Sequence, residues 1–353
     1  MSIIIKNSEK VIIDRTLPEV VKKLKEVDGG ISIKFLTMLK DLGVNMIEVD
    51  RDVLNKIRDI PKNLDYIYRI EDASDIYFMD KYKIDIKYAA IDYKKSLTLN
   101  ENALNILKDK KIMLEVDIKI LDEFYEREDP SILDKLNLEC LRIKHVVKYN
   151  ICGWKRLINN IKEKFHVKVD MCADSIYCMA TAISIEACMD GADSVTAAFN
   201  GQIYGLASLE EVIVGLKVIK NGKVSGNLKL IGEIAEIYTE LTHEKVYRMK
   251  AVIGEDIFKY ESGIHVDGIE KNPVTYEPYN PYDIGEKRTM YIGKHSGRKA
   301  IIIRLNELNI DCGDIDMDAF LKKVRELSIK LKRNIFDDEL IQIYNDFKNT
   351  CLR

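Results

Sequence analysis

Short apolar runs typical of β-strands alternate with stretches of helical apolar spacing through most of the chain. The predicted strands are Lys10–Ile13, Met46–Val49, Tyr66–Arg69, Ile112–Val116, Cys140–Ile143, Val167–Met171 and Ser194–Ala198. The predicted helices are Ile31–Leu42, Ile132–Leu138, Gly153–Phe165, Ala180–Asp190 and Ser208–Lys220. Strands that alternate with helices predict parallel βα units.

Seven or more such units in roughly 240 residues fit a (β/α)8 barrel, whose usual size is about 250 residues. An open, doubly wound sheet is the alternative. A dinucleotide site in such a sheet has no support, because no GxGxxG motif follows a predicted strand.

The composition changes near residue 250, where three of the six prolines cluster in the sequence NPVTYEPYNP. This cluster lies between ESGIHVDG and IGKHSGRKA, so we expect an irregular connector with turns. Amphipathic helices are predicted after it at Arg298–Leu308, Met317–Lys332 and Asp337–Thr350. The expected domains are a barrel at 5–250, a connector or lid region at 251–298 and a helical subdomain at 299–353.

The composition is that of a globular protein, with 46% hydrophobic and 32% charged residues and a net charge of −3. A nucleic-acid partner is not expected without a basic excess, and the short apolar runs exclude a membrane span. The first ten residues, MSIIIKNSEK, predict a strand and not a signal peptide. Seven cysteines without CxxC spacing favour free thiols, so we expect a cytoplasmic protein.

Several segments resemble homocitrate synthases, and the resemblance covers nearly the whole chain. Three of them are the connector motifs Glu261–Gly268 (ESGIHVDG), Thr275–Pro281 (TYEPYNP) and Gly293–Gly297 (GKHSG). Met179–Val195 and Ser208–Val218 resemble the part of the family that follows its metal-binding histidines. The chain is thus identified as a member of the homocitrate synthase and isopropylmalate synthase family. The resemblance implies a pyruvate carboxyltransferase-like barrel that condenses acetyl-CoA with a 2-oxo acid at a divalent metal ion in its mouth.

The first barrel segment departs from the family. The family pattern DTTLRDGEQ or DSTLREGEQ is replaced by IDRTLPEVV at Ile13–Val21. Pro18 replaces an arginine that, by resemblance, stabilises the developing enolate oxygen, and proline has no donor to offer. Loss of one such partner typically lowers the rate about 10²–10³-fold. Glu19 stands at a metal-binding position, where it is either a ligand or a solvated carboxylate.

Two further mouth segments also differ from the family. Its HxHND motif supplies two imidazoles to the metal, whereas Cys172 and Asp174 stand at those positions here. Magnesium and manganese prefer oxygen ligands and a thiolate suits softer ions, so we expect no metal in this chain. Cys172 is then expected to pack as a small buried apolar residue. The segment NGLGERAGN is replaced by Asn200–Ser208, which is shorter and lacks the charged GER residues.

The connector keeps its family motifs. In this family two protomers exchange their C-terminal regions, and a histidine and a tyrosine of one connector enter the active site of the other protomer. Carried over by resemblance, these residues are His265 and Tyr276. An imidazole can move a proton during condensation, and a phenol can orient it. Tyr279 is the packing alternative to Tyr276, and His295 is expected just ahead of the next helix, with Ser296 available as its cap.

The resemblance therefore implies one chain of a two-chain homocitrate synthase, which condenses acetyl-CoA with 2-oxoglutarate for the nitrogenase iron–molybdenum cofactor. The alpha chain would hold a divalent ion of the magnesium or manganese type, and the present chain, inactive alone, would supply its connector residues in trans. One alternative is a self-sufficient acyltransferase whose remodelled metal site consists of Glu19, Cys172 and Asp174. The other is a scaffold or regulatory barrel in which His265 points away from any partner.

Overall fold

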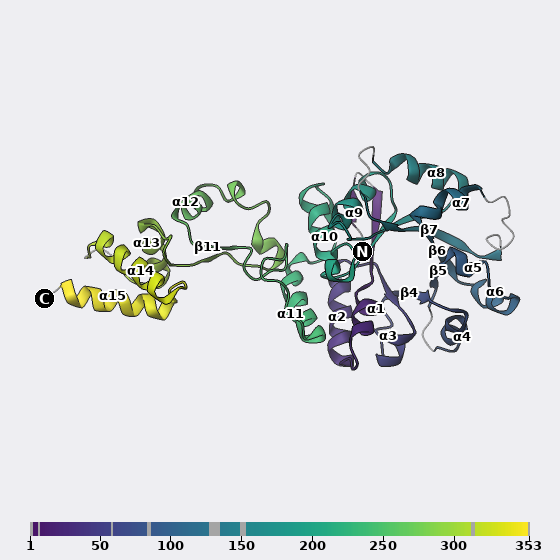
Figure 1. Cartoon of the computed structure of the whole chain (residues 1–353), viewed down its shortest axis with the longest axis horizontal. Coiled ribbons are helices and arrows are strands. Elements are labelled where there is room, and N and C mark those ends of the chain that lie inside the picture. The colour runs from purple at the N-terminus through teal and green to yellow at the C-terminus, as the bar shows by residue number, and fades with distance from the viewer. Residues whose placement is uncertain are drawn as a thin grey trace. The chain divides into compact units, whose positions relative to one another are not determined.

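The computed structural model describes residues 3–5, 8–57, 59–82, 86–126, 135–148, 153–311 and 315–351 (Figure 1). The chain separates into two compact units, Met1–Val246 and Tyr247–Arg353. Each unit has its own hydrophobic core and is described by itself. In the described residues, no helix is long and apolar enough to cross a membrane.

The first unit is a closed barrel of parallel strands. In spatial order the strands are β2 (Ser8–Asp14), β3 (Met46–Val49), β4 (Asp65–Ile70), β5 (Tyr88–Asp92), β6 (Lys111–Asp117), β7 (Leu138–Val146), β8 (Lys168–Ala173) and β9 (Ser194–Ala197). The last strand pairs back with the first, with Val11 opposite Ser194 and Asp14 opposite Ala197. This closure confirms the (β/α)8 barrel and excludes the open sheet.

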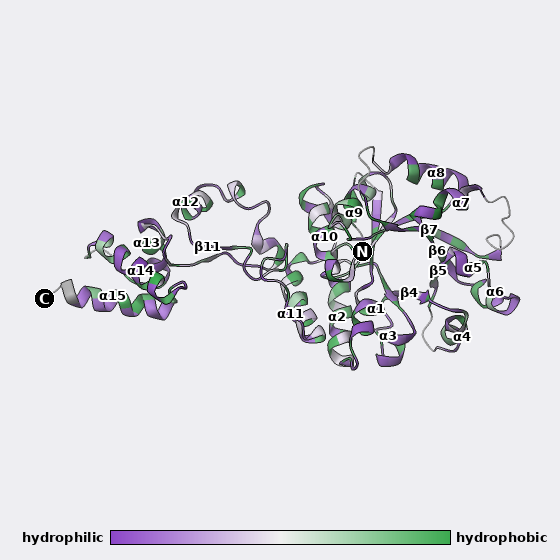
Figure 2. Ribbon diagram, in the orientation of Figure 1, coloured by the Kyte–Doolittle hydropathy of each residue, from purple (hydrophilic) through white to green (hydrophobic). Residues whose placement is uncertain are grey.

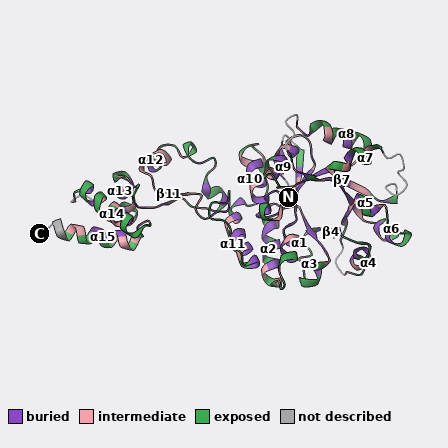
Figure 3. Cartoon of the chain, in the orientation of Figure 1, coloured by how far each residue is buried: buried purple, intermediate pink, exposed green. Residues whose placement is uncertain are grey.

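Helices cover the outside of the barrel, because each crossover returns the chain to the start of the next parallel strand. They are α1 (Thr16–Lys23), α2 (Gly29–Leu42), α3 (Arg51–Lys56), α4 (Ala73–Lys81), α5 (Tyr93–Ser96), α6 (Glu101–Leu107), α7 (Leu121–Glu126), α8 (Lys155–Phe165), α9 (Ala180–Met189), α10 (Leu209–Val218) and α11 (Ile231–Thr242). In Figure 3 these helices turn exposed residues to one side and buried residues to the other. The short strand β1 (Ile3–Ile5) lies antiparallel between β2 and β10 (Lys223–Val224).

Two expectations about this unit were incomplete or wrong. All seven predicted strands overlap with observed ones, but β5 was not predicted, because Ala89 and Ala90 give its sequence a weak strand preference. The predicted helix Ile132–Leu138 is wrong at its end, where Leu138 begins β7. Residues Ile132–Asp134 of that prediction lie outside the described residues.

The barrel interior consists of layers, because alternate residues of each strand point inward. Towards the amino ends of the strands the layer is apolar and contains Ile13, Ile67, Ala90, Met113 and Cys140. The next inward positions, two residues further along each strand, carry the charged side chains Arg15, Arg69, Glu115 and Arg142. The polarity of the interior therefore changes abruptly along the barrel axis.

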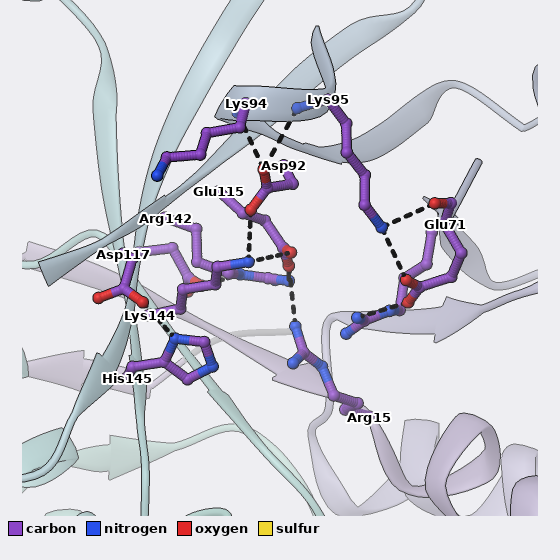
Figure 4. A network of polar contacts seen from close by, with 12 residues as sticks. Arg15, Glu71, Asp92, Lys94, Lys95, Glu115, Asp117, Arg142, Lys144 and His145 are labelled. Carbon is purple, nitrogen blue, oxygen red and sulfur yellow. Dashed lines mark hydrogen bonds and ion pairs between the residues drawn. The ribbon is translucent and has the colours of Figure 1, made fainter. Parts of the chain in front are cut away.

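Arg142 is the centre of this charged layer, and its side chain is fully buried. Its Nε donates to Asp170 over 2.6 Å and its Nη1 donates to Glu115 over 2.9 Å, and it also forms an ion pair with Glu48. Arg15 binds the same two glutamates, through Nε to Glu48 at 2.6 Å and through Nη2 to Glu115 at 3.1 Å. Figure 4 shows the contact between Arg15 and Glu115. With the ion pair between Arg69 and Glu48, the layer joins six strands or strand ends by charge-assisted hydrogen bonds.

The charges in this layer balance. Three guanidinium groups, of Arg15, Arg69 and Arg142, face three carboxylates, of Glu48, Glu115 and Asp170. Burial alone would raise the pKa of Glu48, but the neighbouring arginines outweigh it and hold that pKa lowered to about 2. Glu48 is therefore ionised at neutral pH, and each buried charge of the layer has a partner of opposite sign.

The second unit contains the parallel pair β11 (Lys259–Tyr260) and β12 (Thr289–Met290) and four helices: α12 (Gly263–Lys271), α13 (Arg298–Glu307), α14 (Met317–Leu331) and α15 (Asp337–Cys351). Figure 2 shows apolar and polar residues interleaved along α14 and α15, as expected of helices with one buried face. Their core includes Val266, Ile301, Phe320, Val324 and Leu340. The connector is less irregular than predicted, because its ESGIHVDG motif forms the helix α12.

We predict that Arg142→Met lowers the free energy of unfolding of the barrel by about 3–5 kcal/mol, because it leaves buried carboxylates without their partner. Trp154, the single tryptophan, is buried in this unit, so its fluorescence reports barrel unfolding in a denaturant titration. Lys168→Met is the matched control, since Lys168 pairs with Glu139 on the surface and such pairs contribute about 0–1 kcal/mol. Equal losses in the two variants would contradict the importance of the buried cluster.

Candidate functional site

The three positions that match the family's metal ligands lie at the carboxyl-terminal mouth of the barrel. Glu19 is not at a strand end but in the first turns of α1, where it faces Lys22 at 3.7 Å. Pro18 fits the same helix near its start, where no backbone donor is needed. Cys172 is buried in β8, and Asp174 directly follows that strand and pairs with Leu206.

These residues do not fit a divalent metal ion of the magnesium or manganese type. Burial raises the pKa of the Cys172 thiol, although the guanidinium groups of Arg15 and Arg142 oppose that shift. A metal would need the thiolate, and magnesium or manganese would prefer oxygen. Within the described residues, no group of three His, Cys, Asp or Glu side chains could hold a metal ion.

Arg15 is the mouth residue that sequence reasoning missed. It follows β2 directly and stands where the family pattern has threonine or serine. One feature of the sequence could have indicated its role. Arg15 is a charged residue between the buried end of β2 and the buried first turn of α1. In the structure its side chain is 9% exposed and lies inside the barrel, bound to Glu48 and Glu115.

The shortened segment after β9 closes tightly on itself. Asn200 has a left-handed backbone (φ 52°), and its N–H donates to Glu210 over 3.0 Å. A Cβ atom on Gly201 would lie 2.1 Å from the carbonyl oxygen of Ala207, so glycine is required there. The loop that carries GER in the family is here a compact turn built from backbone contacts.

In the second unit the structure brings the two predicted connector residues together. The rings of His265 and Tyr276 lie 4.7 Å apart with a tilt of 51°. Tyr279, the alternative to Tyr276, packs instead edge-on against Phe258, with the ring centres 5.7 Å apart. His265 lies in the first turn of α12 and not in an irregular turn, which corrects the expectation for its backbone.

Gly268 provides the space for this contact. It lies three residues after His265 and therefore on the same face of α12. A Cβ atom on Gly268 would lie 2.1 Å from Cε2 of Tyr276, so the aromatic ring rests directly on the helix backbone. The glycine of the ESGIHVDG motif is thus needed for the position of the tyrosine in the TYEPYNP motif.

The three connector motifs also hold one another in place. Glu261 accepts a hydrogen bond from the backbone N–H of His295 over 2.7 Å. Asp267 pairs with Lys299 at 2.7 Å. The backbone at Gly297 lies so close to Gly263 that a side chain at either position would touch it.

Two further contacts complete the connector. Arg288 binds Glu277 of the TYEPYNP motif through Nε at 2.8 Å and Nη2 at 2.7 Å. Ser296 does not cap α13 as predicted, because its hydroxyl accepts from the N–H of Gly293 over 2.9 Å and closes the GKHSG loop. Arg325 donates to the Ser296 carbonyl oxygen, which ties this loop to α14.

The His265–Tyr276 pair is exposed, and so are apolar residues close to it in sequence. His265 is exposed and Tyr276 keeps 41% of its area. Among neighbours in sequence, Ile264 is 74% exposed and Val274 is 77% exposed. All four side chains are therefore accessible to another molecule.

Comparison with known proteins agrees with this architecture. A barrel of the same type occurs in an HMG-CoA lyase from Acinetobacter baumannii, which aligns with a TM-score of 0.54 at 12% identity over 70% of this chain and 96% of that one. This level of identity bears on the fold alone, and it agrees with the (β/α)8 barrel of the first unit.

The sequence comparisons define the family. Residues 252–332 match the family described as "Homocitrate synthase post-HMGL domain-like". The chain is 44% identical to the omega subunit of homocitrate synthase from Clostridium pasteurianum over the full length of both. It is 32% identical to a 2-isopropylmalate synthase from Methanocaldococcus jannaschii over 74% of this chain and 50% of that protein. The chain belongs to the homocitrate synthase and isopropylmalate synthase family and is similar throughout to its omega-subunit member.

We predict that Gly268→Ala separates the His265 and Tyr276 rings. Alanine favours a helix over glycine by about 1 kcal/mol, so a neutral site would gain stability. At Gly268 the added methyl group must displace the ring, and we expect loss of the proton–proton NOEs between the two rings. Gly263→Ala is the control, since its Cβ would be 3.4 Å from its nearest neighbour and should leave those NOEs unchanged.

Proposed function

We propose that this chain is the omega-type subunit of a two-chain homocitrate synthase, which condenses acetyl-CoA with 2-oxoglutarate for the nitrogenase iron–molybdenum cofactor. The observation that carries the proposal is the exposed His265–Tyr276 pair on an ordered connector, in a chain whose own barrel mouth does not suit the metal. The full-length similarity to an omega subunit supports it. The partner would be an alpha chain with the intact metal site, and the pair would act in the cytoplasm.

In this proposal the connector completes the active site of the alpha chain. Condensation requires removal of a proton from the methyl carbon of acetyl-CoA, and the His265 imidazole is the group suited to move a proton near neutral pH. Tyr276 positions that imidazole by ring contact, because the two rings pack at 4.7 Å. The exposed Ile264 and Val274 would then be covered by the rim of the partner barrel and exclude water from the reaction.

The two rival functions are less well supported. A self-sufficient enzyme needs Glu19, Cys172 and Asp174 to act as ligands, whereas Glu19 faces Lys22 and Cys172 is a buried thiol beside two arginines. A scaffold without a catalytic contribution gives no reason for His265 to be exposed and ordered by Tyr276 and Gly268. The self-sufficient enzyme predicts activity of the chain alone, whereas the scaffold predicts that His265 is dispensable for the activity of the pair.

We predict that the purified chain alone shows no condensation of acetyl-CoA with 2-oxoglutarate, and that activity appears when the alpha chain is added. The physical reason is the combined change at Pro18, Cys172, Asp174 and the loop after Asn200. Release of coenzyme A, followed with a thiol reagent, measures this directly. Turnover by the chain alone, free of host synthase, would instead establish the remodelled enzyme.

We predict that His265→Ala lowers kcat of the pair by about 10²–10⁴-fold while the two chains still associate, because a general acid or base has been removed. Tyr276→Phe keeps the ring contact and should cost less than Tyr276→Ala, which removes it. Cys172→Ala and Glu19→Gln serve as controls and should leave the rate nearly unchanged. Essential barrel residues together with a dispensable His265 would refute the division of labour.

A further inference from the structure

We propose that the amino-terminal end of the barrel, opposite to its mouth, contains a binding site for a small, neutral aromatic ring. The site is a pocket of about 120 Å³ between the first residues of the strands. The buried Met113 and Cys140 and the partly buried Val11, Met46 and Tyr88 are among the residues that line it. The proposal concerns the barrel alone and does not depend on the two-chain enzyme.

A small side chain on β7 leaves this space in the barrel. Cys140 belongs to the apolar layer of the interior, where it is smaller than the bulky branched residues that usually fill such a layer. The next inward residue on β7 is Arg142, which donates to Asp170 over 2.6 Å and to Glu115 over 2.9 Å. Arg142 cannot move into the space without breaking these charge-assisted hydrogen bonds, so the space is not filled from above.

The polar side chains that line the pocket already have partners within the protein. Glu139 accepts from Lys168 over 2.7 Å, and Asp193 pairs with Lys162 at 2.7 Å. The hydroxyl of Ser194 donates to a carboxylate of the charged layer over 2.6 Å. Water needs about two to four polar partners to remain in such a space, and a polar ligand would have to break existing contacts. The pocket therefore favours an apolar occupant.

The size and lining of the pocket indicate which apolar molecule fits. An apolar cavity of about 150 Å³ in another protein binds benzene or xenon, so a pocket of about 120 Å³ suits a single six-membered ring. Methionine sulfur and tyrosine rings make favourable contacts with aromatic rings, and Met46, Met113 and Tyr88 all line this pocket. An aromatic ring is thus favoured over an alkane of the same size.

The first test measures the melting temperature of the full chain with benzene, followed through the fluorescence of the buried Trp154. Benzene at about ten times its dissociation constant should raise the melting temperature by at least about 2 °C, because it binds the folded barrel alone. Pyrazine has the same size but carries nitrogen atoms at opposite ends, and one of them would be buried without a donor. It should cause no rise. No rise with benzene, or an equal rise with pyrazine, would overturn the proposal.

The second test changes the pocket at one position. Cys140→Leu fills the space and should abolish the effect of benzene. Cys140→Ala also removes the thiol but keeps the space, so the effect should persist. The same response in both variants would place benzene elsewhere and refute the site.

The third test does not depend on the folding of a variant. In crystals of the unmodified chain under xenon pressure, a xenon atom is expected beside Met113 and Cys140. A pocket without xenon would count against the proposal even if Cys140→Leu proved too large for the barrel to fold.

Discussion

The fully buried ion cluster around Arg142 is the interaction on which the barrel depends. Its partners come from different strands, with Glu48 on β3, Glu115 on β6 and Asp170 on β8. A buried guanidinium costs several kcal/mol unless it is paired, so these strands keep the one register that brings the carboxylates to it. The same register places Cys172 at the next inward position above Asp170, so the buried cluster lies directly below the barrel mouth.

The connector depends on a different constraint, which is close approach of backbone segments. Several of the motif residues hold the connector in its folded shape. Glu261 binds the backbone of the GKHSG loop, and Gly297 packs against the start of α12. His265 and Tyr276 differ from these residues because they remain exposed after the connector has folded. A motif whose internal contacts are satisfied and whose histidine faces outward is suited to act on something outside its own unit.

Apolar periodicity predicted most of the barrel, because its strands are rich in residues with strong strand preference. It could not predict barrel closure, since the pairing of β2 with β9 joins segments far apart in sequence. The connector pair was identified from local motifs, but its geometry depends on Gly268, whose role appears only when Tyr276 packs against it. The role of Arg15 could not be predicted, because a single charged residue after a strand does not indicate which buried side chains it will bind.

The charged interior of this barrel makes an electrostatic demand on the sequence, because each buried charge needs a partner. Its interior carboxylates are also structural, since they bind Arg142 and join the strands, so they cannot simply be neutralised. Arg15 meets part of this demand, because its guanidinium binds both Glu48 and Glu115 and so joins the end of β2 to β3 and β6.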